Sequence, residues 1–257
     1  MVDFQCKSRY GWEDFLEIMR LLRAPGGCPW DAEQTHESIR REFLKETYET
    51  LDAIDHDDPA GMCEELGDML MQVLFNIHME EDAGRLYMDD VTDRVCKKLI
   101  FRHPHIFSPG GEALTWDELK RREKGQKSTA EAMDAVAGSL PALWRAEKLQ
   151  KKAAAAGFDY ADVSGALDKL DEETAELRSA VNDASNFEEE LGDVLFAAVK
   201  VGRFCGVDPE QALHGTCEKF LSRFRYVEQR CKDRGAAMDS LPLETLESLW
   251  NEAKHSV

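Results

Sequence analysis

The sequence has 257 residues, 43% of them hydrophobic, so it can form one large folded domain or two smaller ones and is not a disordered tail. Its 51 acidic residues against 32 basic ones give a formal net charge of −19, which would repel a nucleic-acid backbone. We therefore expect no direct nucleic-acid binding. The acidity either serves solubility or includes carboxylates that form a cation site.

The chain in order shows apolar residues at helical spacing. Residues 12–23 place Phe15, Ile18, Met19 and Leu22 on one face. Residues 66–79 do the same with Leu66, Met69, Leu70, Val73, Leu74 and Ile77. Alternating strand patterns are absent, and proline and glycine mark breaks at APGGCPWD, HDDPAG and HPHIFSPGGEA. The sequence therefore predicts an all-α fold.

An internal repeat organises the chain. Four segments of the first half recur in the same order and at nearly constant separations in the second half, which indicates two tandem copies of one helical unit. We expect a first domain at 1–125, a linker at 126–140 and a second domain at 141–257. The matching pairs are CPWD with AGFDY, ETYE with ETAE, EELGDMLM with EELGDVLF, and KLIFRHPHIF with KFLSRFRYVE.

Each copy carries two acidic pairs on consecutive helices. Residues three apart share a helix face, and a short connection such as HDDPAG makes the two helices antiparallel neighbours. Four converging carboxylates would repel one another unless a divalent cation binds, and carboxylate oxygens alone suit Mg²⁺ or Mn²⁺. A di-iron bundle would need Glu-x-x-His, which the motifs lack. The candidate metal ligands are Glu46, Glu49, Glu65 and Asp68 in the first copy, and Glu173, Glu176, Glu190 and Asp193 in the second.

A glycine stands between the same two acids in both copies, at Gly67 and Gly192. Glycine inside a helix costs about 0.5–1 kcal/mol relative to alanine. Its presence twice indicates close helix packing or the close approach of a ligand.

The cysteines and the N-terminus bear on location. The seven cysteines are scattered, odd in number and form no Cys-x-x-Cys pair, which argues against a disulfide framework or a zinc site. The N-terminus has no apolar signal core, and no run of about 18 apolar residues is free of charge. We expect a cytoplasmic protein that does not cross a membrane.

The order Glu-x-x-Glu, then Glu-x-x-Asp, resembles the signature of the all-α nucleoside triphosphate pyrophosphohydrolases. The landmarks GGCPWD, KETYETLDAI, EELGDMLMQVLF, RHPHIF, WDELK, SLPALWRAEKLQKKAAAAGFDY, EELGDVLFA and KFLSRFRYVE are similar to those of two-domain MazG proteins and span nearly the whole chain. The resemblance implies hydrolysis of a nucleoside triphosphate to the monophosphate and pyrophosphate, for control or house-cleaning of the nucleotide pool. It also implies Mg²⁺ as cofactor, with Mn²⁺ as a substitute, and a homodimer in which both subunits complete the helix bundles and the sites.

The resemblance assigns roles residue by residue. Glu172 precedes the ligands of the second copy, and Glu172, Glu173 and Glu190 are its candidate catalytic carboxylates, with Glu172 or Glu173 as a base. In the first copy Lys45 replaces the usual doubled Glu, so we expect the second copy to be the principal site. The nucleotide-binding candidates are Lys169, Lys219, Arg223 and Trp250 in the second copy, and Trp30, Lys98 and Arg102 in the first.

Several of these residues have more than one interpretation. Lys219 and Arg223 lie four apart on one helix face and suit a pyrophosphate leaving group, or form an ordinary solvated face. Trp250 is a stacking platform or a core anchor, and Trp30 a hydrophobic lid or a nucleotide contact. His103 and His105, on either side of a proline, contact phosphate or cap a helix.

Two rival functions fit the same residues. One is a regulatory or scaffolding protein that binds metal or nucleotide without turnover. The other is a related hydrolase on the same scaffold, such as a dUTPase or a phosphoribosyl-ATP pyrophosphatase. Analysis of the reaction products distinguishes a pyrophosphohydrolase from the regulatory protein. Substrate competition distinguishes it from the related hydrolases.

Overall fold

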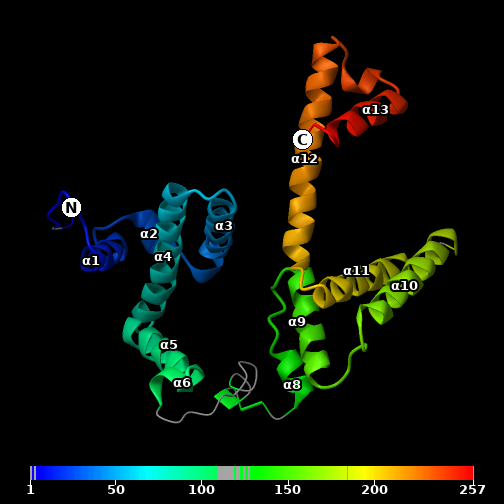
Figure 1. Cartoon of the computed structure of the whole chain (residues 1–257). Coiled ribbons are helices and arrows are strands. Elements are labelled where there is room, and N and C mark those ends of the chain that lie inside the picture. Colours follow the sequence, from blue (N-terminus) through cyan, green and yellow to red (C-terminus); the bar gives the residue numbers. More distant parts are fainter. Residues whose placement is uncertain are drawn as a thin grey trace. The chain divides into compact units, whose positions relative to one another are not determined.

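The computed structural model describes residues 2, 4–108, 119, 122, 123, 125, 126, 128–183 and 185–256. The chain divides into two compact units, Met1–Glu123 and Lys124–Val257. Every regular element in the described residues is a helix, which confirms the all-α prediction (Figure 1). A short helix, α8 (Thr129–Asp134), lies inside the expected linker, and the exact domain limits stay a prediction. Among the helices described in either unit, none has the length and apolarity needed to cross a membrane.

The first unit is built around a helical hairpin. Helices α3 and α4 pack along each other, and α1 packs against α4 (Figure 1). The predicted break after α1 contains Gly26, whose φ of +86° is left-handed and favours glycine. The helices of this unit are α1 (Trp12–Arg23), α2 (Pro29–Glu33), α3 (His36–Asp55), α4 (Pro59–Asp82), α5 (Met88–Arg102) and α6 (Pro104–Phe107).

The turn between α3 and α4 follows from the predicted break HDDPAG. Asp57 has a left-handed φ of 49°, and the carboxylate of Asp58 accepts hydrogen bonds from the backbone N–H groups of Ala60 and Gly61, each at 3.1 Å. Pro59 is the first residue of α4, where a helix does not use the missing N–H. The chain therefore reverses within a few residues, and the two acidic pairs come to lie on neighbouring helices.

The core of this unit confirms part of the predicted apolar faces. Met19 of α1 and Leu74 of α4 are each only 1% exposed and belong to one buried cluster. In the first half of the predicted face of α4, however, Leu66, Leu70 and Val73 are 45%, 44% and 36% exposed. The described part of the unit supplies no cover for this half of the predicted face.

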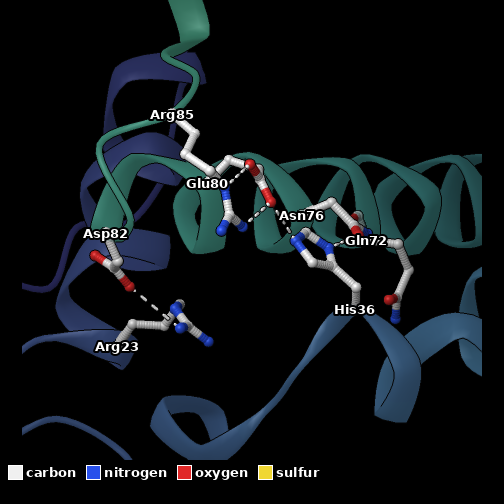
Figure 2. Close-up of polar contacts among 7 residues, drawn as sticks. All are labelled: Arg23, His36, Gln72, Asn76, Glu80, Asp82 and Arg85. Carbon is white, nitrogen blue, oxygen red and sulfur yellow. Dashed lines mark hydrogen bonds and ion pairs between the residues drawn. The ribbon is translucent and has the colours of Figure 1, made fainter.

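A polar network fixes the start of α3 against α4 (Figure 2). The two ring nitrogens of His36 lie 2.6 Å from Asn76 Oδ1 and 2.7 Å from Glu80 Oε1. The Arg85 guanidinium donates to both carboxylate oxygens of Glu80, at 2.8 and 2.7 Å. These contacts fix how the hairpin that carries the first acidic pairs is assembled.

The second unit contains the corresponding hairpin, formed by α10 and α11, which lie side by side (Figure 1). Asn186, with a left-handed φ of 45°, precedes α11. Helix α9 packs on α11, and α13 packs on α12 through Val227, Cys231 and Leu249. The helices are α8, α9 (Ala142–Ala155), α10 (Val163–Asp183), α11 (Phe187–Phe204), α12 (Pro209–Asp233), the 3₁₀ helix η1 (Met238–Ser240) and α13 (Leu243–Ala253).

The segment that leads into α10 is held on α11. The guanidinium Nη2 of Arg203 donates to both oxygens of the Asp159 carboxylate, at 2.6 and 2.7 Å.

All seven cysteines are free, as their scattered spacing predicts.

Candidate metal and nucleotide site

The first hairpin brings three of its predicted ligands together. One carboxylate oxygen from each of Glu46, Glu49 and Glu65 lies within 4.8 Å of the others. Two of these residues come from α3 and one from α4, as the sequence predicts. Asp68 lies outside this set, but its charge acts on Glu46 and on Glu65.

The electrostatics of the first cluster reflect crowded negative charge. Burial, a hydrogen bond with Glu49 and the charges of Glu49 and Asp68 raise the pKa of Glu46, against the opposing charge of Lys45. Burial and the same two negative charges raise the pKa of Glu65. Glu49 differs because its hydrogen bond from Lys45 holds its pKa below the usual range. The Lys45 ammonium lies 2.7 Å from Glu49 Oε2 and 3.5 Å from Glu46 Oε1.

The second hairpin forms an equivalent cluster from Glu173 of α10 with Glu190 and Asp193 of α11, whose oxygens again lie within 4.8 Å of one another. Glu176 is adjacent. Desolvation, a hydrogen bond with Glu173 and the charges of Glu173 and Glu190 raise the pKa of Glu176. The structure therefore groups three of the four predicted ligands and leaves the fourth in electrostatic contact.

Lys169 and Glu172 adjoin the second cluster. The Lys169 ammonium lies 2.7 Å from Glu173 Oε1 and 2.9 Å from Glu172 Oε1, and these hydrogen bonds raise the pKa of Lys169. Lys169 thereby orients the two residues that are the candidates for a base. Glu172 is largely exposed, whereas Glu173 is 7% exposed.

Each cluster opens into a pocket at the turn end of its hairpin. The first pocket, of about 280 Å³, is bordered by Glu49 and Glu65, and the second, of about 500 Å³, by Glu176 and Glu190. The remaining polar lining differs between the copies. It consists of Asp52, His56 and Asp58 in the first, and of Glu172, Ser179, Ser185 and Asn186 in the second.

The two glycines between the acids are not explained by packing within the chain. A Cβ atom at Gly67 or at Gly192 would meet no atom within 4 Å. Close helix packing, the first interpretation of these glycines, therefore does not hold for the described residues of one chain. The approach of a ligand stays a prediction.

The nucleotide-binding candidates of the first unit are not gathered at the acidic cluster. Trp30 is 61% exposed on α2, and Lys98 and Arg102 lie on α5, whose main contacts are with α6. The Arg102 guanidinium donates to Glu123 Oε2 at 2.6 Å. His103 Nδ1 lies 2.7 Å from the carbonyl of Leu99 at the end of α5, so this imidazole caps a helix.

The candidates of the second unit lie on α12 and α13. Lys219 is exposed and Arg223 half-buried on α12, which contacts α13 and α9 more extensively than α11. Trp250 packs against the Val227–Leu249 cluster, and its ring lies 5.1 Å from that of Phe220, so it acts as a core anchor in the single chain.

The donor set of the clusters suits a hard divalent cation. The grouped side chains are carboxylates, which supply the oxygen ligands that Mg²⁺ and Mn²⁺ prefer. Glu46 is 7% exposed, and its Oε2 has no hydrogen-bond partner among the described residues. A buried carboxylate oxygen without a partner is costly and would be satisfied by a cation.

Comparisons with known proteins identify the family to which the sequence belongs. Residues 34–107 and 161–227 each match the MazG nucleotide pyrophosphohydrolase domain. The chain is 40% identical over 245 residues to the nucleoside triphosphate pyrophosphohydrolase/pyrophosphatase MazG of Thermotoga maritima, covering 95% of both chains. It is 43% identical over 250 residues to the nucleoside triphosphate pyrophosphohydrolase of Escherichia coli K12, covering 93% of this chain and 95% of the relative. The chain belongs to the MazG family.

The two MazG segments include both carboxylate clusters. The first segment also contains Lys98 and Arg102, and the second contains Lys219 and Arg223. Trp30 and Trp250 lie outside the matched ranges. The tandem repeat deduced from the sequence is therefore confirmed as two MazG domains.

Sequence reasoning missed the polar residues that line the two pockets beside the acids. Asp52 and His56 lie on the last turn and C-cap of α3, and Ser185 and Asn186 in the turn before α11. These positions carry no repeated motif, because the two turns differ in sequence. Only their place at the closed end of each hairpin could have indicated them.

Proposed function

We propose that this protein hydrolyses nucleoside triphosphates to the monophosphate and pyrophosphate with Mg²⁺, and that the second copy is the principal site. The observation that carries the proposal is the second carboxylate cluster, which spans α10 and α11 within a MazG segment. The relatives named nucleoside triphosphate pyrophosphohydrolases support the reaction class. Mn²⁺ is proposed as a substitute for Mg²⁺ because it accepts the same oxygen ligands.

Glu173, Glu176, Glu190 and Asp193 are the proposed ligands of the second site. A bound divalent cation supplies positive charge for the phosphate oxygens and lowers the pKa of the attacking water. The proton of that water is accepted by Glu172, which is exposed and hydrogen-bonded to Lys169, or by Glu173. Lys169 holds both carboxylates in place by its two short ion pairs.

Groups that neutralise the leaving pyrophosphate must come from outside the hairpin. Lys219 and Arg223 present two cations four residues apart on α12 and suit that role. Because α12 makes its main contacts away from α10, we propose that a second copy of the chain completes the site. The exposed apolar residues of both hairpins, which include Leu66, Leu70, Leu191, Leu195 and Phe196, support a homodimer. Light scattering on the purified chain tests this, and a monomer would contradict it.

Product analysis tests the reaction. Purified protein with Mg²⁺ is incubated with each of the common ribo- and deoxyribonucleoside triphosphates, and the nucleoside monophosphate and pyrophosphate are measured. Formation of both products in equal amounts supports the proposal. Binding of nucleotide without products would instead indicate a regulatory protein, and exclusive use of dUTP would indicate a dUTPase.

The ranking of the copies has its own matched test. Glu190→Gln removes a ligand from the second cluster, and Glu65→Gln removes the equivalent ligand from the first. We expect Glu190→Gln, and likewise Asp193→Asn, to lose most turnover and Glu65→Gln to retain it, with circular dichroism showing an intact helical fold in each. The reverse result would make the first copy the principal site.

A further inference from the structure

The two copies place a lysine and a glutamate in exchanged positions before the buried glutamate of the cluster. The first copy has Glu42 four residues before Glu46 and Lys45 directly before it. The second copy has Lys169 four residues before Glu173 and Glu172 directly before it. Each cluster therefore has one adjacent lysine, but the two lysines approach it from different positions of the helix.

The exchanged positions lead to different ion pairs. Lys45 lies 2.7 Å from Glu49, a member of the first cluster, and 3.5 Å from Glu46. The residue equivalent to Glu49 in the second copy is Glu176, which is not among the ion-pair partners of Lys169. Lys169 forms ion pairs with both Glu173 and Glu172. The carboxylate of Glu172, which the first copy lacks at this position, therefore partly neutralises the charge of Lys169.

The equivalent carboxylates of the two copies therefore differ in their nearest cation. The Lys45 ammonium donates to Glu49 Oε2 at 2.7 Å. The ion pairs of Lys169 are with Glu173 and Glu172 instead, so Glu176 has no ion pair with a lysine among the described residues. Glu49 thus already has a cation in direct contact, whereas Glu176 does not.

The first cluster nonetheless keeps a capacity for a cation. Glu46 is 7% exposed, and its Oε2 has no partner in the described part of the chain, even though Lys45 lies near the other oxygen. The ammonium of Lys45 therefore satisfies Glu49 without satisfying Glu46 fully.

We propose that Lys45 is a resident counter-ion of the first site, so that this site binds a divalent cation more weakly than the second site of the same chain. A cation that binds the first cluster must displace Lys45 from Glu49 and is repelled by its ammonium. The first site consequently fills at higher free cation concentrations than the second. This inference rests on the proposed function in taking both clusters as metal sites.

The test is a Mn²⁺ titration of the full-length chain without nucleotide, in which electron paramagnetic resonance measures free Mn²⁺. We expect the wild-type protein to show two classes of site that differ in affinity. Glu190→Gln lowers the Mn²⁺ affinity of the second site, so that the Mn²⁺ binding that remains reports the affinity of the first site. In that background, Lys45→Gln should tighten Mn²⁺ binding by roughly tenfold, since it removes one unit of repulsion close to the ion. Lys45→Glu should tighten it further.

Lys97→Gln is the matched control, because it removes the same charge from the same unit. Lys97 pairs with Asp93 on α5, and its side chain is 75% exposed. We expect no change in Mn²⁺ affinity from this variant. Equal affinity of the two wild-type sites, or an affinity unaffected by Lys45→Gln, would overturn the proposal. If the two sites bind Mn²⁺ equally while products still form, the role of Lys45 is wrong and the proposed reaction stands. Absence of Mn²⁺ binding at both sites would overturn the role of Lys45 and the proposed metal dependence of the reaction together.

Discussion

His36 and Glu80, 44 positions apart in the sequence, are joined by a 2.7 Å contact between Nε2 and Oε1 that links α3 to α4 (Figure 2). On the other side of the ring, Nδ1 faces Asn76 Oδ1 at 2.6 Å. The amide nitrogen of Asn76 donates to the carbonyl of Gln72, which fixes the orientation of the amide and turns its oxygen towards His36. Both ring nitrogens thus face acceptors, and only the imidazolium, with two N–H donors, satisfies them both.

The charge of His36 makes the start of α3 dependent on pH. Its hydrogen bonds with Asn76 and Glu80 raise the pKa of His36 above the usual 6.5. A cation with a raised folded-state pKa stabilises the fold fully below pH 6.5 and loses that contribution as the pH rises through the raised value. Amide exchange protection at the start of α3 should therefore fall on going from about pH 6 to pH 9.

Two histidine variants test this dependence by hydrogen exchange. His36→Gln should remove the pH-dependent part of the protection in α3. His214→Gln, which changes an exposed histidine of α12, should leave it as in the wild type. The same pH profile in all three proteins would contradict the role of His36. Glu80 remains ionised across this range, because Arg85 and His36 lower its pKa to about 2.

The hairpins were predictable from the sequence because their signals are local. The turn residues of HDDPAG and the helical spacing of the acids suffice to place Glu46, Glu49 and Glu65 on adjacent helices. The exposure of Leu66 and Leu70 was not predictable, because a pattern shows which face is apolar but not what covers it. The positions of Lys98 and Lys219 also depend on how later helices pack, which no local spacing determines.

The carboxylate crowding of the first cluster predicts that removing a charge stabilises the metal-free protein. Burial and the charges of Glu49 and Asp68 raise the pKa of Glu65, so its ionised form opposes folding at neutral pH, and stability from this group increases as the pH falls through the raised pKa. Glu65→Gln should raise the melting temperature without metal. Addition of Mg²⁺ should raise the melting temperature of the wild type more than that of the variant.

The control for this prediction is Glu247→Gln, which removes the same charge from an exposed position on α13. Its melting temperature should match that of the wild type with and without metal. The structure indicates that the three carboxylates of the first cluster repel one another. A Glu65→Gln variant that melts no higher than the wild type without metal would contradict this repulsion.

The Arg203–Asp159 pair predicts a loss of stability in the second unit. Burial raises the pKa of Asp159, but the hydrogen bonds from Arg203 and from the Tyr160 N–H together lower it. Asp159→Asn should cost about 1–3 kcal/mol in denaturant unfolding, because Arg203 loses a charged partner in a position where its side chain is only 12% exposed. Asp171→Asn, on an exposed face of α10, should have little effect. Equal stability of the two variants would show that the pair does not hold the segment before α10.

The glycines between the acids distinguish a ligand from helix packing. A Cβ at Gly192 meets no atom within 4 Å, so Gly192→Ala should stabilise the metal-free chain by about 0.5–1 kcal/mol through helix propensity. If substrate approaches this position, the same methyl group should lower turnover. Gly67→Ala in the first copy should give the same stabilisation with little loss of turnover, because the second copy is the proposed principal site. Denaturant unfolding and pyrophosphate release measure the two effects separately. Destabilisation by both substitutions would mean that a helix of another copy packs on the glycines, and unchanged turnover in Gly192→Ala would exclude a ligand at that position.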